Sequence, residues 1–228
     1  VAGLRGESGQ SARIVIGRED DRVERYQALG GVRMVGCNLH QGMRPHRMAD
    51  ADRAGDPGLI QEAVKAASGA DAVIFVGGFI HGYTDAWNDN AYDAEGVDKT
   101  TIQLPFGQDE LIKAVLNSNP RTTVVLYGGG PVDMSAWIDN TKALIQAWYP
   151  GMEGGNALAK ILFGDVNPSG KLPVTFPKKL EDSPAHALGA YPGVDGRMEY
   201  KEDIFVGYRY YDTYKVEPLF HFGHGLSY

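Results

Sequence analysis

Downstream of residue 57, stretches with helical spacing of apolar residues alternate with short, wholly apolar runs. The stretch 57–68 has a proline near its start and places apolar side chains on one stripe, namely Leu59, Ile60, Ala63, Val64 and Ala67. The run 72–77 (AVIFVG) is typical of a strand buried on both faces. The same two patterns predict further helices at 108–117, around 132–137 and at 156–163, and further strands at 122–127, 143–148 and 171–176.

This alternation predicts the α/β class, with a mostly parallel sheet that carries helices on both faces. In such sheets the crevice lies outside the carboxyl ends of the strands. Three segments should therefore meet at one rim: the loop that follows Gly77, the turn 128–130, and the chain after Trp148.

The two ends of the chain have weaker patterns. Residues 12–16 and 32–35 resemble short strands, and we interpret the whole segment 1–56 as a divergent edge of the same domain. Residues 177–203 indicate a long surface connection, and the tyrosine-rich run 204–212 (IFVGYRYYD) favours a strand.

Composition narrows the choice of partners. A chain of 228 residues with 43% hydrophobic residues can fill the core of one large domain. Its net charge of −7, without a cluster of lysine and arginine, argues against nucleic acid as a partner. No apolar run approaches the roughly 20 residues that span a bilayer, so we expect no membrane partner.

The loop 79–101 is the best candidate for a site. It is long, follows a predicted buried strand, and interleaves aromatic residues with carboxylates: Tyr83, Asp85, Trp87, Asp89, Tyr92, Asp93, Glu95 and Asp98. Such a mixture is typical of sugar sites, where rings stack on the sugar and carboxylates bind hydroxyls or transfer protons. Trp87 and Tyr92 are the candidate substrate-binding residues. The alternative is an acidic, solvated excursion.

Other chemistries lack their signatures. The glycine-rich turn at 128–131 contains neither phosphate-loop motif, which counts against a flavodoxin-like cofactor protein. The six histidines show no metal-ligand spacing, and Ser135 and Ser227 lack the setting of a hydrolase nucleophile. Cys37 is the single cysteine and cannot form an internal disulfide. We expect no metal and no cofactor.

Several segments, collinear over residues 57–228, resemble glycoside hydrolase family 3, the β-glucosidase and β-xylosidase family. They are 92–99 (YDAEGVDK), 103–105 (QLP), 107–112 (GQDELI), 130–132 (GPV), 147–157 (AWYPGMEGGNA), 162–173 (LFGDVNPSGKLP), 206–212 (VGYRYYD) and 220–228 (FHFGHGLSY).

The resemblance implies that residues 57–228 are the C-terminal domain of this family, an α/β/α sandwich that packs beside a catalytic (β/α)8 barrel. In the family, a loop of the sandwich lends the general acid/base to the barrel. That role would fall on Glu95, with Asp93 and Asp85 as the other candidates. The nucleophile would be an aspartate of the barrel, outside these 228 residues. Lys99 stands where the family commonly has arginine, a difference expected to affect support of the loop.

The function implied is that of a retaining β-glycosidase acting on terminal, non-reducing β-linked glucose or a similar sugar. Retaining enzymes place two carboxyl groups about 5–5.5 Å apart, and the acid needs a raised pKa. We expect this chain to be inactive alone. Its partners would be a barrel and a β-linked oligosaccharide or glycoside, and it could form oligomers. The family resemblance implies a secreted or periplasmic location. The alternative is a non-catalytic carbohydrate-binding or interaction module.

Overall fold

The computed structural model describes residues 55–79, 93 and 98–228. These residues form two units. The first comprises 55–79, 93, 98–99, 104–129 and 136–166, and the second comprises 100–103, 130–135 and 167–228. The predicted strands at 12–16 and 32–35 lie outside the described residues.

The first unit is built on a parallel sheet of three strands. These are β1 (Val73–Gly78), β2 (Thr122–Tyr127) and β3 (Ala143–Gln146), in the order β1-β2-β3. Val73 lies opposite Thr122, and Thr123 lies opposite Ala143. The parallel arrangement puts the carboxyl ends of all three strands at one edge.

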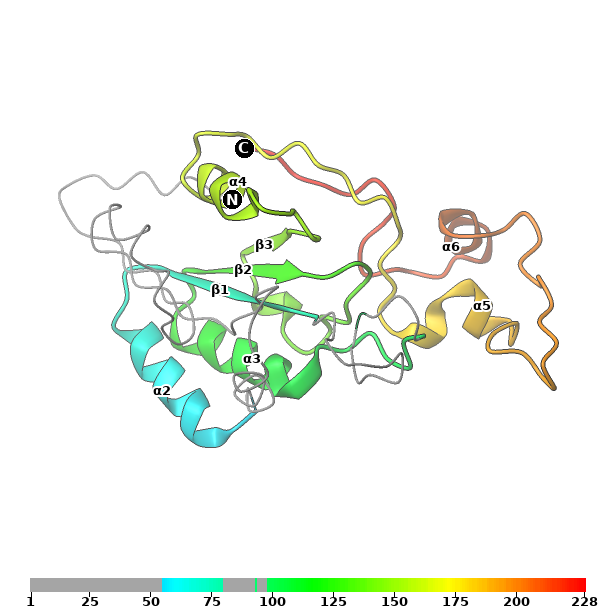
Figure 1. Cartoon of the computed structure of the whole chain (residues 1–228), viewed down its shortest axis with the longest axis horizontal. Helices are drawn as coiled ribbons and strands as arrows, with labels where there is room; N and C mark the ends of the chain where they lie inside the picture. Colours follow the sequence, from blue (N-terminus) through cyan, green and yellow to red (C-terminus); the bar gives the residue numbers. More distant parts are fainter. Residues whose placement is uncertain (1–54, 80–92, 94–97) are drawn as a thin grey trace. The chain divides into compact units, whose positions relative to one another are not determined.

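Helices cover both faces of this sheet (Figure 1). Helix α3 (Gln108–Ser118) contacts β1 and β2, and α2 (Pro57–Ser68) packs against α3. On the other face, Leu158 and Leu162 of α4 (Gly154–Leu162) pack against the buried Ile74 and Val125. The layers are therefore helix, sheet and helix, and the predicted α/β/α sandwich is confirmed.

Polar side chains fix the ends of these elements. Asp56 caps α2 by accepting hydrogen bonds from the amides of Gly58 and Leu59. Asn119, just after α3, donates to the carbonyls of Ala67 (3.0 Å) and Ala70 (2.8 Å) at the end of α2. The Ala67 carbonyl also accepts from the Ala70 amide (3.1 Å), so Asn119 reinforces the turn in which α2 ends.

The end of β1 is held from two sides. Gly78 has a φ of 139°, and a Cβ atom there would collide with the backbone of Tyr127 in the next strand. From α3, the side chain of Gln108 accepts from the Gly78 amide (2.9 Å) and donates to the Gly78 carbonyl (2.9 Å) and to the Pro105 carbonyl (3.2 Å). Gln108 therefore sets the point at which the candidate loop leaves the sheet.

The second unit contains little regular structure. Its helices are a 3₁₀ helix (Leu180–Asp182), α5 (Pro184–Ala187) and α6 (Tyr208–Tyr214). The surface connection predicted at 177–203 thus contains two short helices. None of the helices in the described ranges combines the length and the apolar character needed to cross a bilayer.

The strand predicted at 204–212 is wrong, because residues 208–214 form α6. Gly207, with a φ of 56° and a ψ of −135°, directly precedes the helix, and residues 201–204 before it form turns. The Tyr210 ring then packs against that of Tyr214, one helical turn later, with ring centroids 4.9 Å apart and the ring planes tilted by 40°. This i, i+4 aromatic contact outweighs the strand preference of tyrosine.

Two other predicted elements also differ. The segment 171–176 makes one isolated bridge, between Phe176 and Phe220, because Pro173 has no amide to continue a ladder. The helix predicted around 132–137 is a turn followed by a 3₁₀ helix (Ile138–Asn140). Here the Asp133 carboxylate accepts from the amide and the hydroxyl of Ser135, a local bond that competes with helix formation.

Candidate functional site

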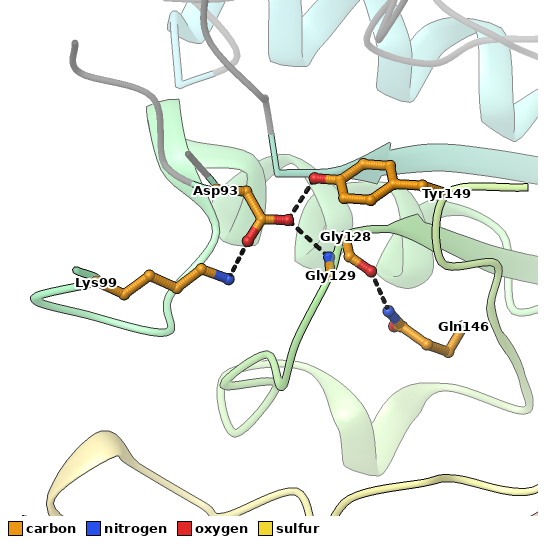
Figure 2. A network of polar contacts seen from close by, with 6 residues as sticks. All are labelled: Asp93, Lys99, Gly128, Gly129, Gln146 and Tyr149. Carbon is orange, nitrogen blue, oxygen red and sulfur yellow. Dashed lines mark hydrogen bonds and ion pairs between the residues drawn. The ribbon is translucent and has the colours of Figure 1, made fainter. Parts of the chain in front are cut away.

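The rim at the carboxyl ends of the strands carries a polar network centred on Asp93 (Figure 2). Asp93 belongs to the chain that follows β1. Its Oδ2 atom accepts hydrogen bonds from the Gly129 amide (2.6 Å), which follows β2, and from the Tyr149 hydroxyl, which follows β3. For Asp93, Gly129 and Tyr149, the predicted meeting of three segments at one rim is confirmed.

Lys99 completes this group of four residues, the Asp93 network. Its Nζ lies 2.5 Å from Asp93 Oδ1 and 3.9 Å from the centre of the Phe79 ring. Phe79 is buried at the exit of β1, and its amide donates to the Tyr127 carbonyl (2.9 Å). Lys99 thus links the Asp93 carboxylate to Phe79 at the end of β1.

The backbone is shaped to bring these groups together. Trp148 has a φ of 55°, a left-handed conformation that is costly for a bulky residue, and it directly precedes Tyr149. Beside it, Gln146 donates to the Gly128 carbonyl (3.3 Å) and ties β3 to the turn after β2. A Cβ atom on Gly129 would lie only 3.2 Å from Asp93 Oδ2, so glycine allows the carboxylate its close approach.

The surroundings of Asp93 favour its ionised form. The side chain is only 9% exposed, and burial by itself would raise its pKa. The hydrogen bonds from Lys99, Tyr149 and Gly129, together with the charge of Lys99, outweigh burial and lower the pKa below its ordinary value. Burial, with the neighbouring Asp93 carboxylate, raises the pKa of the Tyr149 hydroxyl, so that this group stays a donor.

We expect this network to make stability depend on pH at the acid end. The folded state lowers the pKa of Asp93, so ionised Asp93 adds to the free energy of unfolding. This stabilisation is complete above the pKa of an unfolded aspartate, about 3.9, and it is lost as the pH falls through the pKa of the folded state. Asp93→Asn should therefore lower the free energy of unfolding by about 1–3 kcal/mol at neutral pH, since the bonds lost are charge-assisted.

Urea denaturation of the original chain and of Asp93→Asn at several pH values measures this. The difference between the two free energies of unfolding should shrink below about pH 4. A difference that stays constant from neutral to acid pH would show that ionised Asp93 does not stabilise the fold.

The structure does not describe the other site residues proposed from the sequence. Glu95, Asp85, Trp87 and Tyr92 fall outside the described residues. Of that set the structure places Asp93 alone, with three donors around its carboxylate. In the described ranges, no three His, Cys, Asp or Glu side chains are grouped to hold a metal ion.

Reasoning from the sequence assigned no role to Tyr149 or Gln108. Tyr149 stands in the segment 147–157, and Gln108 stands in the segment 107–112, both of which carry the family resemblance. That resemblance marked the two positions, but the contacts that give each its role are visible only in the fold.

Comparison with known proteins places this chain in a family. The model of the glycosyl hydrolase family 3 C-terminal domain matches residues 8–228. The chain is 50% identical over 173 residues to the beta-glucosidase BoGH3A of Bacteroides ovatus. The aligned region covers 75% of this chain and 22% of that protein. The chain spans about a fifth of the length of the curated relatives it matches.

Solved structures agree with this assignment. A family 3 beta-glucosidase of Bifidobacterium adolescentis is similar with a TM-score of 0.72 and 36% identity, covering 90% of this chain and 27% of that one. A beta-glucosidase of Kluyveromyces marxianus, solved in complex with glucose, is similar with a TM-score of 0.68 and 40% identity. The match covers 76% of this chain and 19% of that one. This chain therefore belongs to the glycosyl hydrolase family 3 C-terminal domain family.

Proposed function

We propose that this chain is the sandwich domain of a retaining β-glycosidase that hydrolyses terminal, non-reducing β-linked glucose or a similar sugar. The observation that carries the proposal is its 50% identity to a beta-glucosidase of which it spans 22%. The rest of such an enzyme has to supply the nucleophile and most of the sugar pocket. We assign these to a (β/α)8 barrel, whether on the same chain or on another.

In this proposal Glu95 is the general acid/base. A retaining glycosidase needs one carboxylate to attack the anomeric carbon and one carboxylic acid to protonate the leaving oxygen. The acid has to carry its proton when substrate binds, which requires a raised pKa. Asp93 has a lowered pKa and accepts from three donors, so its environment suits an anion. Glu95, two residues further on, is the better candidate, with Asp85 next.

The proposal also covers the substrate contacts and the domain limits. Trp87 and Tyr92 are the aromatic residues that would stack on the sugar. We place the segment 1–56 at the edge of the same domain, and the family match, which begins at residue 8, supports this.

The test uses the assembled enzyme, meaning this chain together with a family 3 barrel domain. We expect the chain alone to leave an aryl β-glucoside intact. We expect the assembled enzyme to hydrolyse it, and native mass spectrometry should show the barrel bound to the 24.7 kDa chain. Hydrolysis by the chain alone would contradict the need for a barrel. An assembled enzyme that binds sugars without cleaving them would favour the alternative, a non-catalytic carbohydrate-binding module.

A further inference from the structure

We propose that the exposed apolar residues around α6 form an interface, which docks on the part of a family 3 enzyme that this chain lacks. We define this surface, the α6 surface, by five residues of the second unit: Ile204, Val206, Tyr208, Tyr214 and Phe222. The inference rests on the proposed function, because it takes the chain to be one domain of a larger enzyme. It names the surface by which this domain is held.

The first support is the exposure of apolar side chains. The exposed fractions of the α6 surface run from 42% for Tyr208 to 63% for Ile204. Apolar residues exposed singly are ordinary, whereas several gathered around one short helix mark an interaction site. Helix α3 shows the usual pattern of a helix that faces water, since its exposed side chains are Glu110, Lys113 and Asn117.

The second support is that the exposed rings are already held in place. Tyr208 packs against Phe222 with ring centroids 5.1 Å apart. Tyr214 packs against Phe205 at 6.0 Å and against the buried Tyr210 at 4.9 Å. Side chains that are ordered before association lose little freedom when a partner covers them. The α6 surface is therefore organised for binding in advance.

The composition of the α6 surface favours a protein over a sugar as its occupant. A sugar stacks on a flat ring face, whereas the planes of Tyr208 and Phe222 meet at 31°. Ile204 and Val206 carry no ring at all and are both more exposed than Tyr208. Arg209 lies over the Tyr208 ring, at 5.7 Å from its centre. Aromatic residues together with arginine are typical of the centre of protein interfaces.

The length of the relatives identifies the occupant as another part of the same enzyme. The chain matches only 20–22% of two beta-glucosidases, so most of such an enzyme lies outside it. A second copy of this chain is a weaker candidate, because two chains with a net charge of −7 each repel one another. The docking face should be apolar, with an acidic or carbonyl acceptor opposite Arg209.

Hydrogen exchange of the chain alone and of the assembled enzyme tests where the interface lies. We expect the backbone amides of 204–214 and 219–226 to exchange at least about tenfold more slowly in the assembled enzyme, because the partner covers α6 and the segment around Phe222 and suppresses their local opening. Exchange rates that are the same in both preparations would overturn the inference.

Val206→Glu and Val194→Glu are matched variants for a second measurement. Both valines are exposed, at 51% and 72%, but only Val206 belongs to the α6 surface. Val206→Glu should weaken binding of the chain to the barrel domain by about a hundredfold, since the interface would bury an unpaired charge. Phe222→Ala should weaken it by about tenfold.

Val194→Glu should bind the barrel domain as the original chain does, and all three variants should keep the urea midpoint of the original chain, because the substituted positions are exposed. Native mass spectrometry at several concentrations measures the binding. Equal affinities of Val206→Glu and Val194→Glu would overturn the inference.

The outcomes distinguish this inference from the proposed function. If the assembled enzyme hydrolyses an aryl β-glucoside while 204–222 exchanges as in the chain alone, the proposed function stands and the interface is overturned. If exchange slows but no glucoside is cleaved, the interface stands and the glycosidase function fails. Slower exchange of the chain alone at higher concentration would indicate a second copy, and slower exchange with cellobiose would indicate a sugar site. Either result would overturn the inference.

Discussion

Glu95→Gln in the assembled enzyme is expected to lower kcat/KM for alkyl β-glucosides by about 10²–10⁴-fold, the usual worth of general acid catalysis. The alkoxide leaving group of these substrates is a strong base and cannot depart without a proton. A dinitrophenyl group departs as a stable anion, so the first step on that substrate should be nearly unchanged. The measurement is a comparison of pre-steady-state and steady-state rates on the two substrates.

Glu62→Gln is the matched control for this variant, because Glu62 is an exposed glutamate of α2. It should have the rates of the original enzyme on both substrates. An equal loss on both substrates in Glu95→Gln would instead indicate damage to the fold or to sugar binding. Asp85 would then be the next candidate for the general acid/base, and a substitution of Asp85 would be tested with the same two substrates.

The second large effect is expected at Gln108, which is 2% exposed and bonds to both backbone groups of Gly78. Leucine is similar in size and cannot replace these bonds. Gln108→Leu should reduce the free energy of unfolding by about 2–4 kcal/mol, since each buried backbone group left unpaired costs about 1–3 kcal/mol. Chemical denaturation of the chain measures this loss.

Gln61→Leu makes the same change at an exposed position of α2 and should alter stability by no more than about 0.5 kcal/mol. If the two variants were equally stable, the Gln108 bonds would contribute nothing net to the fold. Gln108 would then not be what sets the exit of the candidate loop from β1.

The periodic part of the chain was predictable because local pattern and burial agree there. The stripe at 57–68 has the bounds of α2, and the helix predicted at 108–117 is one residue shorter than α3. The runs at 72–77 and 122–127 correspond to β1 and β2, and they are apolar throughout because helices cover both faces of the sheet. The rim could be placed from topology alone, since parallel strands end at one edge.

The site was less predictable because its bonds join residues that are distant in sequence. Asp93 and Tyr149 are 56 positions apart, and nothing local distinguishes Asp93 from the other carboxylates of its loop. Gln108 has a polar side chain at the start of a helix, where polar residues are usually exposed. At 204–212, strand preference predicted the wrong element because the packing of Tyr210 against Tyr214 is a contact that only a helix brings about.

The most direct test of the proposed role is the distance between two carboxyl groups in a crystal structure of the assembled enzyme with glucose bound. We predict that the Glu95 carboxyl lies about 5–5.5 Å from an aspartate of the barrel, across the anomeric carbon, as a retaining mechanism requires. A separation beyond about 6.5 Å, or another carboxylate in that place, would contradict the assignment of Glu95 as the proton donor.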